Sequence, residues 1–157
     1  MRWKTWKPYI LWIALAEGVG FLSWLFTRNA MTIYNTMLVR PPLSPPAIVF
    51  PIVWIILFAL MGIGAARIAT SPNRTEEDIS LNLFVAQLVV NFFWSFFFFN
   101  ARAFGFAAIW LVLLWALVLL MILSFRKVDK IAAWLQIPYL IWLTFAAYLN
   151  FAVYLLN

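Results

Sequence analysis

The run FGFAAIWLVLLWALVLLMILSF occupies residues 104–125 and carries no charged side chain. A hydrocarbon core about 30 Å thick is crossed by about 20 apolar residues in a helix, so this run is long enough to span a membrane. Outward from it, four further apolar runs qualify, at about residues 9–26, 47–69, 79–99 and 131–156. The sequence therefore predicts an all-α membrane protein, a single domain (residues 1–157) built as a five-transmembrane-helix bundle.

The composition excludes a water-soluble domain and several kinds of chemistry. Of 157 residues, 67% are hydrophobic and 10% charged, whereas soluble domains carry about 25% charged residues. The chain has no cysteine and no histidine, so thiolate and imidazole chemistry is absent and no metal site is predicted. With no Gly-rich phosphate loop and no paired intramembrane carboxylates, hydrolase and kinase-type activities are excluded as well.

The basic residues indicate topology rather than nucleic-acid binding, although the net charge is +6. Five spans place the two termini on opposite sides of the membrane. Basic residues are more numerous on the cytoplasmic side of membrane proteins. The N-terminal side holds Arg2, Lys4, Lys7, Arg67, Arg74, Arg126, Lys127 and Lys130. The other side holds Arg28, Arg40 and Arg102. We therefore expect a cytoplasmic N-terminus in an inner or plasma membrane.

Proline content singles out two segments. The longest predicted connection is residues 27–46, and its end, RPPLSPP at residues 40–46, contains four prolines that favour a stiff, extended chain. In the last apolar run, Pro138 leaves a backbone carbonyl without its helical partner and predicts a kink.

Polar and aromatic residues recur at helical spacing in three of the runs. The stripes are Pro51, Trp54, Phe58 and Met61; Gln87, Asn91 and Ser95, flanked by Trp94 and Phe98; and Tyr139, Trp142, Ala146 and Asn150. Amides facing lipid cost free energy, so these faces should point inward. They predict either hydrogen bonds that join helices, or an aromatic pocket for a flat apolar ligand.

Three other features leave alternatives open. Glu17 lies midway along the first run and is either protonated or directed into a cavity, with a proton or ligand role possible there. Gly62 and Ala66 are four residues apart, which suits close packing within the chain or an oligomer face. The run at 104–125 has tryptophans but no amides, so we expect it to be a lipid-facing wall.

Several separated motifs, in order, resemble the TspO/MBR family of tryptophan-rich sensory proteins and translocator proteins. They are YN at 34–35, Leu38, RPPLSPP at 40–46, FP at 50–51, Trp54, Asn91, Trp94, FFF at 97–99, Ala133, PY at 138–139, Trp142, FA at 145–146 and LN at 149–150. The resemblance covers nearly the whole chain and implies a five-helix bundle, often a homodimer, whose pocket is closed by the first loop. The family is associated with porphyrins such as protoporphyrin IX, with haem, with benzodiazepine-type drugs and, in animals, with cholesterol.

Carried over by position, the resemblance implies a ligand pocket and a lid. The pocket residues would be Trp54, Asn91, Trp94, Phe97, Phe98, Tyr139, Trp142, Ala146 and Asn150. The lid residues would be Tyr34, Asn35, Arg40, Pro45 and Pro46. Leu43 stands where the family often has an aromatic, and Phe151 replaces the tyrosine of the animal sterol motif, with no basic residue after Lys130. Leu43 leaves the lid with less stacking surface, and the altered sterol motif argues against cholesterol.

The expected function is binding of a tetrapyrrole in the pocket, with a sensory, regulatory or transport role and no obligatory cofactor. Because histidine and cysteine are missing, metal-free porphyrin, or haem held without strong axial ligation, is favoured. One alternative is light-dependent porphyrin breakdown, with Trp54 and Trp142 as oxidisable partners in place of an assured catalytic residue. Another is a transporter or scaffold for small apolar ligands. The expected partners are membrane lipid and the ligand, with no nucleic acid.

Overall fold

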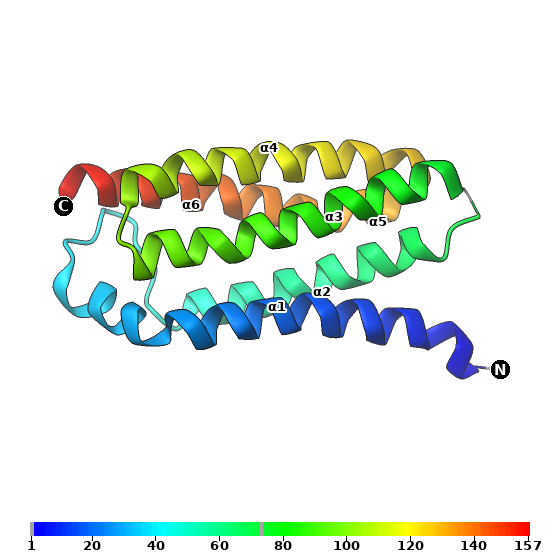
Figure 1. The fold of residues 1–157 in the computed structure, drawn as a ribbon, viewed down its shortest axis with the longest axis horizontal. Coiled ribbons are helices and arrows are strands. Elements are labelled where there is room, and N and C mark those ends of the chain that lie inside the picture. The colour runs from blue at the N-terminus through cyan, green and yellow to red at the C-terminus, as the bar shows by residue number, and fades with distance from the viewer. Residues whose placement is uncertain (1, 73) are drawn as a thin grey trace.

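The computed structural model describes residues 2–72 and 74–157, with the side chains of Arg74 and Thr75 also left out. Its helices run alongside one another, and the two termini lie at opposite ends of the bundle (Figure 1). The elements are α1 (Arg2–Met37), α2 (Val49–Ala69), α3 (Arg74–Ser95), the π-helical segment η1 (Phe96–Asn100), α4 (Phe104–Val128), α5 (Lys130–Trp134) and α6 (Ile137–Leu156). The described residues contain no strand.

Five helical segments are long and apolar enough to cross a membrane. They are α1, α2, α3 continued by η1, α4, and α5 continued by α6. Large apolar side chains such as Ile109, Ile141 and Phe26 are more than 60% exposed, as expected of a surface that meets lipid rather than water. The predicted all-α, five-span membrane fold is confirmed.

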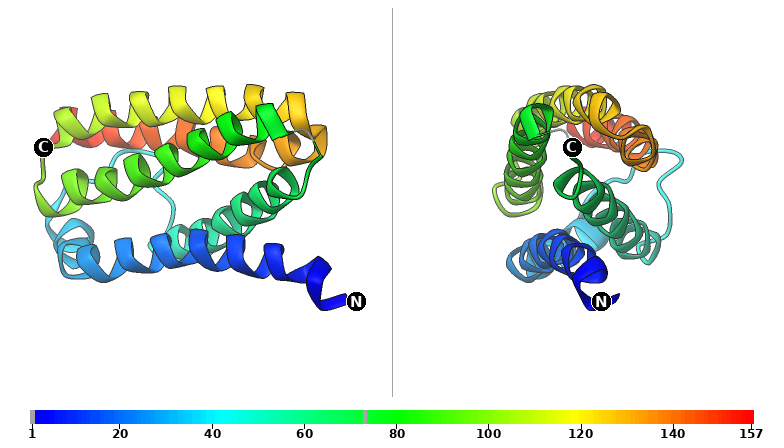
Figure 2. Two further views of the ribbon diagram at one scale, coloured as in Figure 1. Left: turned by 45° about the vertical axis from the view of Figure 1, so that its right-hand side comes forward. Right: turned by 90° about the vertical axis from the view of Figure 1, so that its right-hand side faces the viewer.

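The helices are arranged so that α1 lies at the edge of the bundle. In the end-on view of Figure 2, α1 and α2 lie on one side, while α3, α4 and α6 form an arc on the other. α1 packs mainly against α2, and more lightly against α3 and η1. Only 11% of its apolar window is buried in the protein, compared with 33–39% in the other four spans. α1 is therefore the span most exposed to lipid.

The prediction that residues 104–125 form a lipid-facing wall is wrong for one face of that helix. α4 packs between α3 and α6 and buries Ala107, Leu111, Leu114, Val118, Met121, Ile122, Ser124 and Phe125. Three of its polar groups bond to neighbouring helices: Trp110 Nε1 donates to Val90 O at 2.7 Å, Trp115 Nε1 donates to Thr144 Oγ1 at 2.9 Å, and Ser124 Oγ lies 2.7 Å from Ser80 Oγ. The absence of amides suggested that no face of this helix points inward. One face does, and it packs mainly through small and branched apolar side chains.

The first helix is longer than predicted. The apolar run ends near residue 26, but α1 continues to Met37, so Tyr34 and Asn35 are helical and the connection shrinks to residues 38–48. A fall in hydropathy marks where a helix leaves the membrane, not where it ends. The residue before a proline avoids the helical region, so the prolines that begin at Pro41 limit the helix instead.

The last span is interrupted where the proline predicts a distortion. α5 ends at Trp134 and α6 begins at Ile137, with Pro138 in its first turn, where the missing N–H is tolerated. Gln136 is fully buried at this break and donates from Nε2 to Leu60 O of α2 at 3.2 Å. Gly64 makes room for it, because a Cβ there would meet the same Nε2 atom. The break is thus filled by a side chain that ties the last span to α2.

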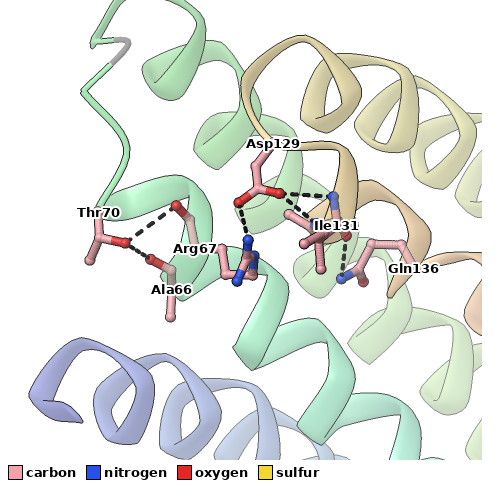
Figure 3. A network of polar contacts seen from close by, with 7 residues as sticks. Ala66, Arg67, Thr70, Asp129, Ile131 and Gln136 are labelled. Atoms are coloured by element: carbon pink, nitrogen blue, oxygen red, sulfur yellow. Dashed lines mark hydrogen bonds and ion pairs between the residues drawn. The ribbon is translucent and has the colours of Figure 1, made fainter. Parts of the chain in front are cut away.

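A polar network closes the end of the bundle that holds the N-terminus (Figure 3). Asp129 Oδ1 accepts from Ile131 N at 2.8 Å and Ala132 N at 3.2 Å, which caps α5. Asp129 Oδ2 also forms an ion pair with Arg67 Nη2 at 2.8 Å, joining α2 to the connection after α4.

Gly62 lies where α2 packs against α1 of the same chain. A Cβ at this position would meet the backbone of Ile13 in α1, with Ile13 N only 2.7 Å away. Gly62 therefore lets α1 and α2 approach more closely than any larger residue would permit.

Candidate functional site

A cavity of about 490 Å³ lies between α1, α2, α3 with η1, and α6. Nine of its lining side chains are aromatic: Phe21, Trp24, Tyr34, Phe50, Trp54, Phe58, Trp94, Phe98 and Phe99. The volume falls within the range of about 300–1,000 Å³ that holds small molecules in proteins. α4 and α5 contribute no residue to its wall.

One face of α1 forms a full side of the cavity, and most of this face was not predicted from the sequence. Its lining residues include Gly20, Ser23, Thr27, Met31 and Tyr34, spaced by three or four positions as one helix face requires. Their chemistry is mixed, so hydropathy alone did not single them out. The spacing of small and hydroxyl residues was the signal that could have found them.

On the α2 side, Trp54 forms the centre of an aromatic cluster. Its ring lies 5.5 Å from Phe58, 6.2 Å from Tyr139 and 6.4 Å from Trp142, the last two edge-to-face. Phe50 in turn meets Trp142 edge-to-face at 5.9 Å. Large rings hold α2 and α6 apart, where small residues would let them close together, and the space beside them is the cavity.

A chain of hydrogen bonds runs behind the cavity from α2 through α3 to α6. Gln87 Nε2 donates to Met61 Sδ at 3.7 Å, Tyr139 Oη donates to Gln87 Oε1 at 2.8 Å, and Asn91 Nδ2 donates to Tyr139 Oη at 2.6 Å. Gln87 and Tyr139 are at most 1% exposed. Asn91 is the member of the chain that reaches the cavity.

A second pair of polar side chains joins α3 to α6. Trp94 Nε1 donates to Asn150 Oδ1 at 3.0 Å, while Asn150 Nδ2 donates to Phe104 O at 2.9 Å. Asn150 is 1% exposed, and both ends of its amide are occupied. Asn91 and Asn150 thus serve as interhelical hydrogen bonds and cavity wall together, so the two alternatives from the sequence are not exclusive.

The π-helical segment η1 divides the run of phenylalanines between two faces. Ala101 N bonds to Phe96 O at 3.0 Å, the five-residue spacing that widens the turn. Phe98 and Phe99 line the cavity. Phe97 instead packs edge-to-face on α4, 4.9 Å from Phe106 and 5.0 Å from Trp110.

The structure brings six of the nine predicted pocket residues to the cavity wall: Trp54, Asn91, Trp94, Phe98, Ala146 and Asn150. The other three lie outside it. Phe97 faces α4, Tyr139 is buried behind Asn91, and Trp142 stands behind Trp54. Spacing along a helix identifies an inward face, but not whether a ring reaches the cavity or lies one layer deeper.

The predicted lid residues also divide. Tyr34 and Asn35 line the cavity from the last turns of α1, whereas Arg40, Pro45 and Pro46 do not line it. The connection 38–48 is held across the end of the bundle by Tyr148 Oη, which donates to Pro42 O at 2.8 Å. Val39 exchanges two hydrogen bonds with the Asn157 side chain, at 3.0 and 3.1 Å.

A smaller crevice of about 240 Å³ lies beside the cavity, between α1 and the α3–η1 segment. It shares Ser23 and Thr27 with the main cavity. Phe26 and Phe92 stand there edge-to-face at 6.2 Å, and Asn100 Nδ2 donates to Phe26 O at 3.0 Å.

Five spans, four of which enclose an aromatic cavity, define a multi-pass α-helical membrane protein with an internal site. The model of the TspO/MBR family matches residues 12–156, and the chain belongs to that family. It is 40% identical to the tryptophan-rich protein TspO of Chlorobaculum tepidum over 148 residues, 94% of each chain. It is 30% identical to the translocator protein of Ovis aries (95% of this chain, 89% of the relative) and 36% to protein CrtK of Rhodobacter capsulatus (75% and 74%).

Proposed function

We propose that this protein binds a tetrapyrrole in the aromatic cavity and serves a sensory, regulatory or transport role through that binding. The cavity itself carries the proposal. It is large enough for a small molecule, and nine of its lining side chains are aromatic. A flat, mostly apolar ring system matches such walls, because aromatic pairs contribute about 0.5–1.5 kcal/mol each beyond the area they bury.

The lining residues suit a metal-free porphyrin better than haem. The chain has no histidine or cysteine, the usual strong axial ligands. Met31 and Tyr34 are the lining side chains whose sulfur or oxygen could approach an iron. The aromatic rings offer a porphyrin stacking surfaces that need no axial bond.

Titration with protoporphyrin IX, followed by its absorption and by quenching of tryptophan fluorescence, tests this proposal. Trp54→Ala removes a cavity ring and should weaken binding about tenfold, the equivalent of one stacking contact of about 1.4 kcal/mol. Trp110→Ala removes an equally large ring that packs on η1 and does not line the cavity. The affinity of Trp110→Ala for protoporphyrin IX should match that of the wild type. Equal affinity in Trp54→Ala and the wild type, or equal losses in both variants, would contradict the proposal.

A further inference from the structure

The charge lining the cavity is confined to one end. Glu17 is the one acidic residue on the wall, and no lysine or arginine of the described residues lines it. Glu17 is partly buried and has no ion pair or hydrogen bond within the described part of the chain. A carboxylate within a membrane span costs about 2.5–3.5 kcal/mol on insertion scales, so an unpartnered one is a candidate for contact with a ligand.

The orientation of the Asn91 amide adds a second acceptor to the wall. The thioether of Met61 can only accept, so Gln87 must direct its Nε2 to Met61 and its Oε1 to Tyr139. Tyr139 therefore donates its single proton to Gln87 and accepts from Asn91 Nδ2. Asn91 Oδ1 is left as the free end, with no bond to any described residue and not among the buried unpaired atoms.

The opposite end of the cavity has the opposite charge nearby. Asn35 lines the cavity, and its Oδ1 and carbonyl oxygen accept from Arg40 Nη2 at 2.9 and 3.2 Å. Glu17 and Asn35 are 18 positions apart on α1, roughly 27 Å at 1.5 Å per residue. The cavity therefore carries a negative charge toward one end and a guanidinium just beyond the other.

We propose that the Glu17 part of the cavity is a site for a protonated amine or other N–H donor carried on a flat apolar body. Glu17 supplies the countercharge from α1, and Asn91 Oδ1 can accept a further hydrogen bond from the α3 side of the cavity. This site goes beyond tetrapyrrole binding, since it selects by charge rather than by ring shape. It also orients any ligand with carboxylates, because like charges direct those groups away from Glu17 and toward Arg40.

A matched pair of probes tests the site: 1-pyrenemethylamine and 1-pyrenemethanol, which share one ring system and differ in charge. Binding is followed by energy transfer from tryptophan to pyrene, with the protein in nanodiscs of zwitterionic lipid so that lipid charge does not favour the amine. The wild type should bind the amine at least tenfold more tightly than the alcohol. Glu17→Gln should abolish that preference, because the amine loses its countercharge and therefore much more affinity than the alcohol.

Asp78→Asn is the matched control, because it removes the same charge from an exposed position that does not line the cavity. It should retain the full preference for the amine. Equal binding of both probes to the wild type, a preference that survives in Glu17→Gln, or no binding of either probe would each overturn the proposal. Protoporphyrin IX is titrated on the same samples. A protein that binds the amine through Glu17 but no porphyrin refutes the tetrapyrrole proposal alone.

Discussion

Replacing two tryptophans by phenylalanine, one at a time, should give opposite effects on stability. Trp94 Nε1 donates to Asn150 Oδ1 at 3.0 Å, whereas Trp142 Nε1 is buried without a partner. Both changes remove the same atoms, so the loss of buried apolar area is similar and largely cancels between them. The difference in their free energies of unfolding then reports the hydrogen bond.

The size of the difference in free energy of unfolding follows from the surroundings of each indole nitrogen, Nε1 of Trp94 and Nε1 of Trp142. Trp94→Phe leaves Asn150 Oδ1 unpaired in a residue that is 1% exposed, which costs about 1–3 kcal/mol. Trp142→Phe removes an N–H whose burial without a partner costs about 1–3 kcal/mol, and so regains that amount. Hydrogen bonds between membrane helices average about 0.6 kcal/mol, so we take the lower end of both ranges, about 1 kcal/mol for each variant. We expect Trp94→Phe to be the less stable variant by about 2 kcal/mol.

The assay is unfolding in mixed micelles by increasing SDS, followed by far-ultraviolet circular dichroism. Trp142→Phe should unfold at or above the wild-type midpoint, and Trp94→Phe below it. If area alone governed stability, both variants would be destabilised alike. A Trp142→Phe protein that loses as much stability as Trp94→Phe would refute the reasoning.

Three further outcomes are expected. In the same SDS assay, Gly62→Ala should destabilise the bundle by more than 1 kcal/mol, because its Cβ meets the Ile13 backbone, whereas Gly18→Ala, with nothing within 4 Å, should be neutral. Tyr139→Phe should cost about 1–3 kcal/mol by that measure, since two hydrogen bonds are lost. Asn157→Ala frees Val39 of both its bonds, so hydrogen exchange by mass spectrometry should speed up in the connection 38–48 and not in α4.

The sequence predicted the spans well, because membrane insertion is governed by apolar length. The ends of α2 and the start of α4 lie within two residues of the predicted positions. The end of α1 does not, since helix continues into polar sequence until Met37. Hydropathy measures the preference of side chains for lipid and does not report backbone hydrogen bonds outside the membrane.

The cavity was only partly predictable, for a different reason. Trp54 and Asn91 were found because large rings and amides are unusual inside membrane helices. The α1 face was missed because Gly20 and Ser23 resemble ordinary packing residues. Tyr139 and Trp142 share the inward face of α6 with Ala146, yet only Ala146 reaches the wall. Depth depends on side-chain directions from several helices at once, which one-dimensional spacing does not contain.

The edge position of α1 makes the membrane itself part of the cavity. This helix supplies a complete side of the wall, from Glu17 to Asn35, yet lipid covers most of its surface. Phe21 and Trp24 line the cavity and are 60% and 46% exposed, so their other sides rest against acyl chains. Bilayer thickness and lateral pressure therefore act directly on the width of the space. The affinity for any ligand held there is a property of protein and lipid together, and will differ between membranes of different composition.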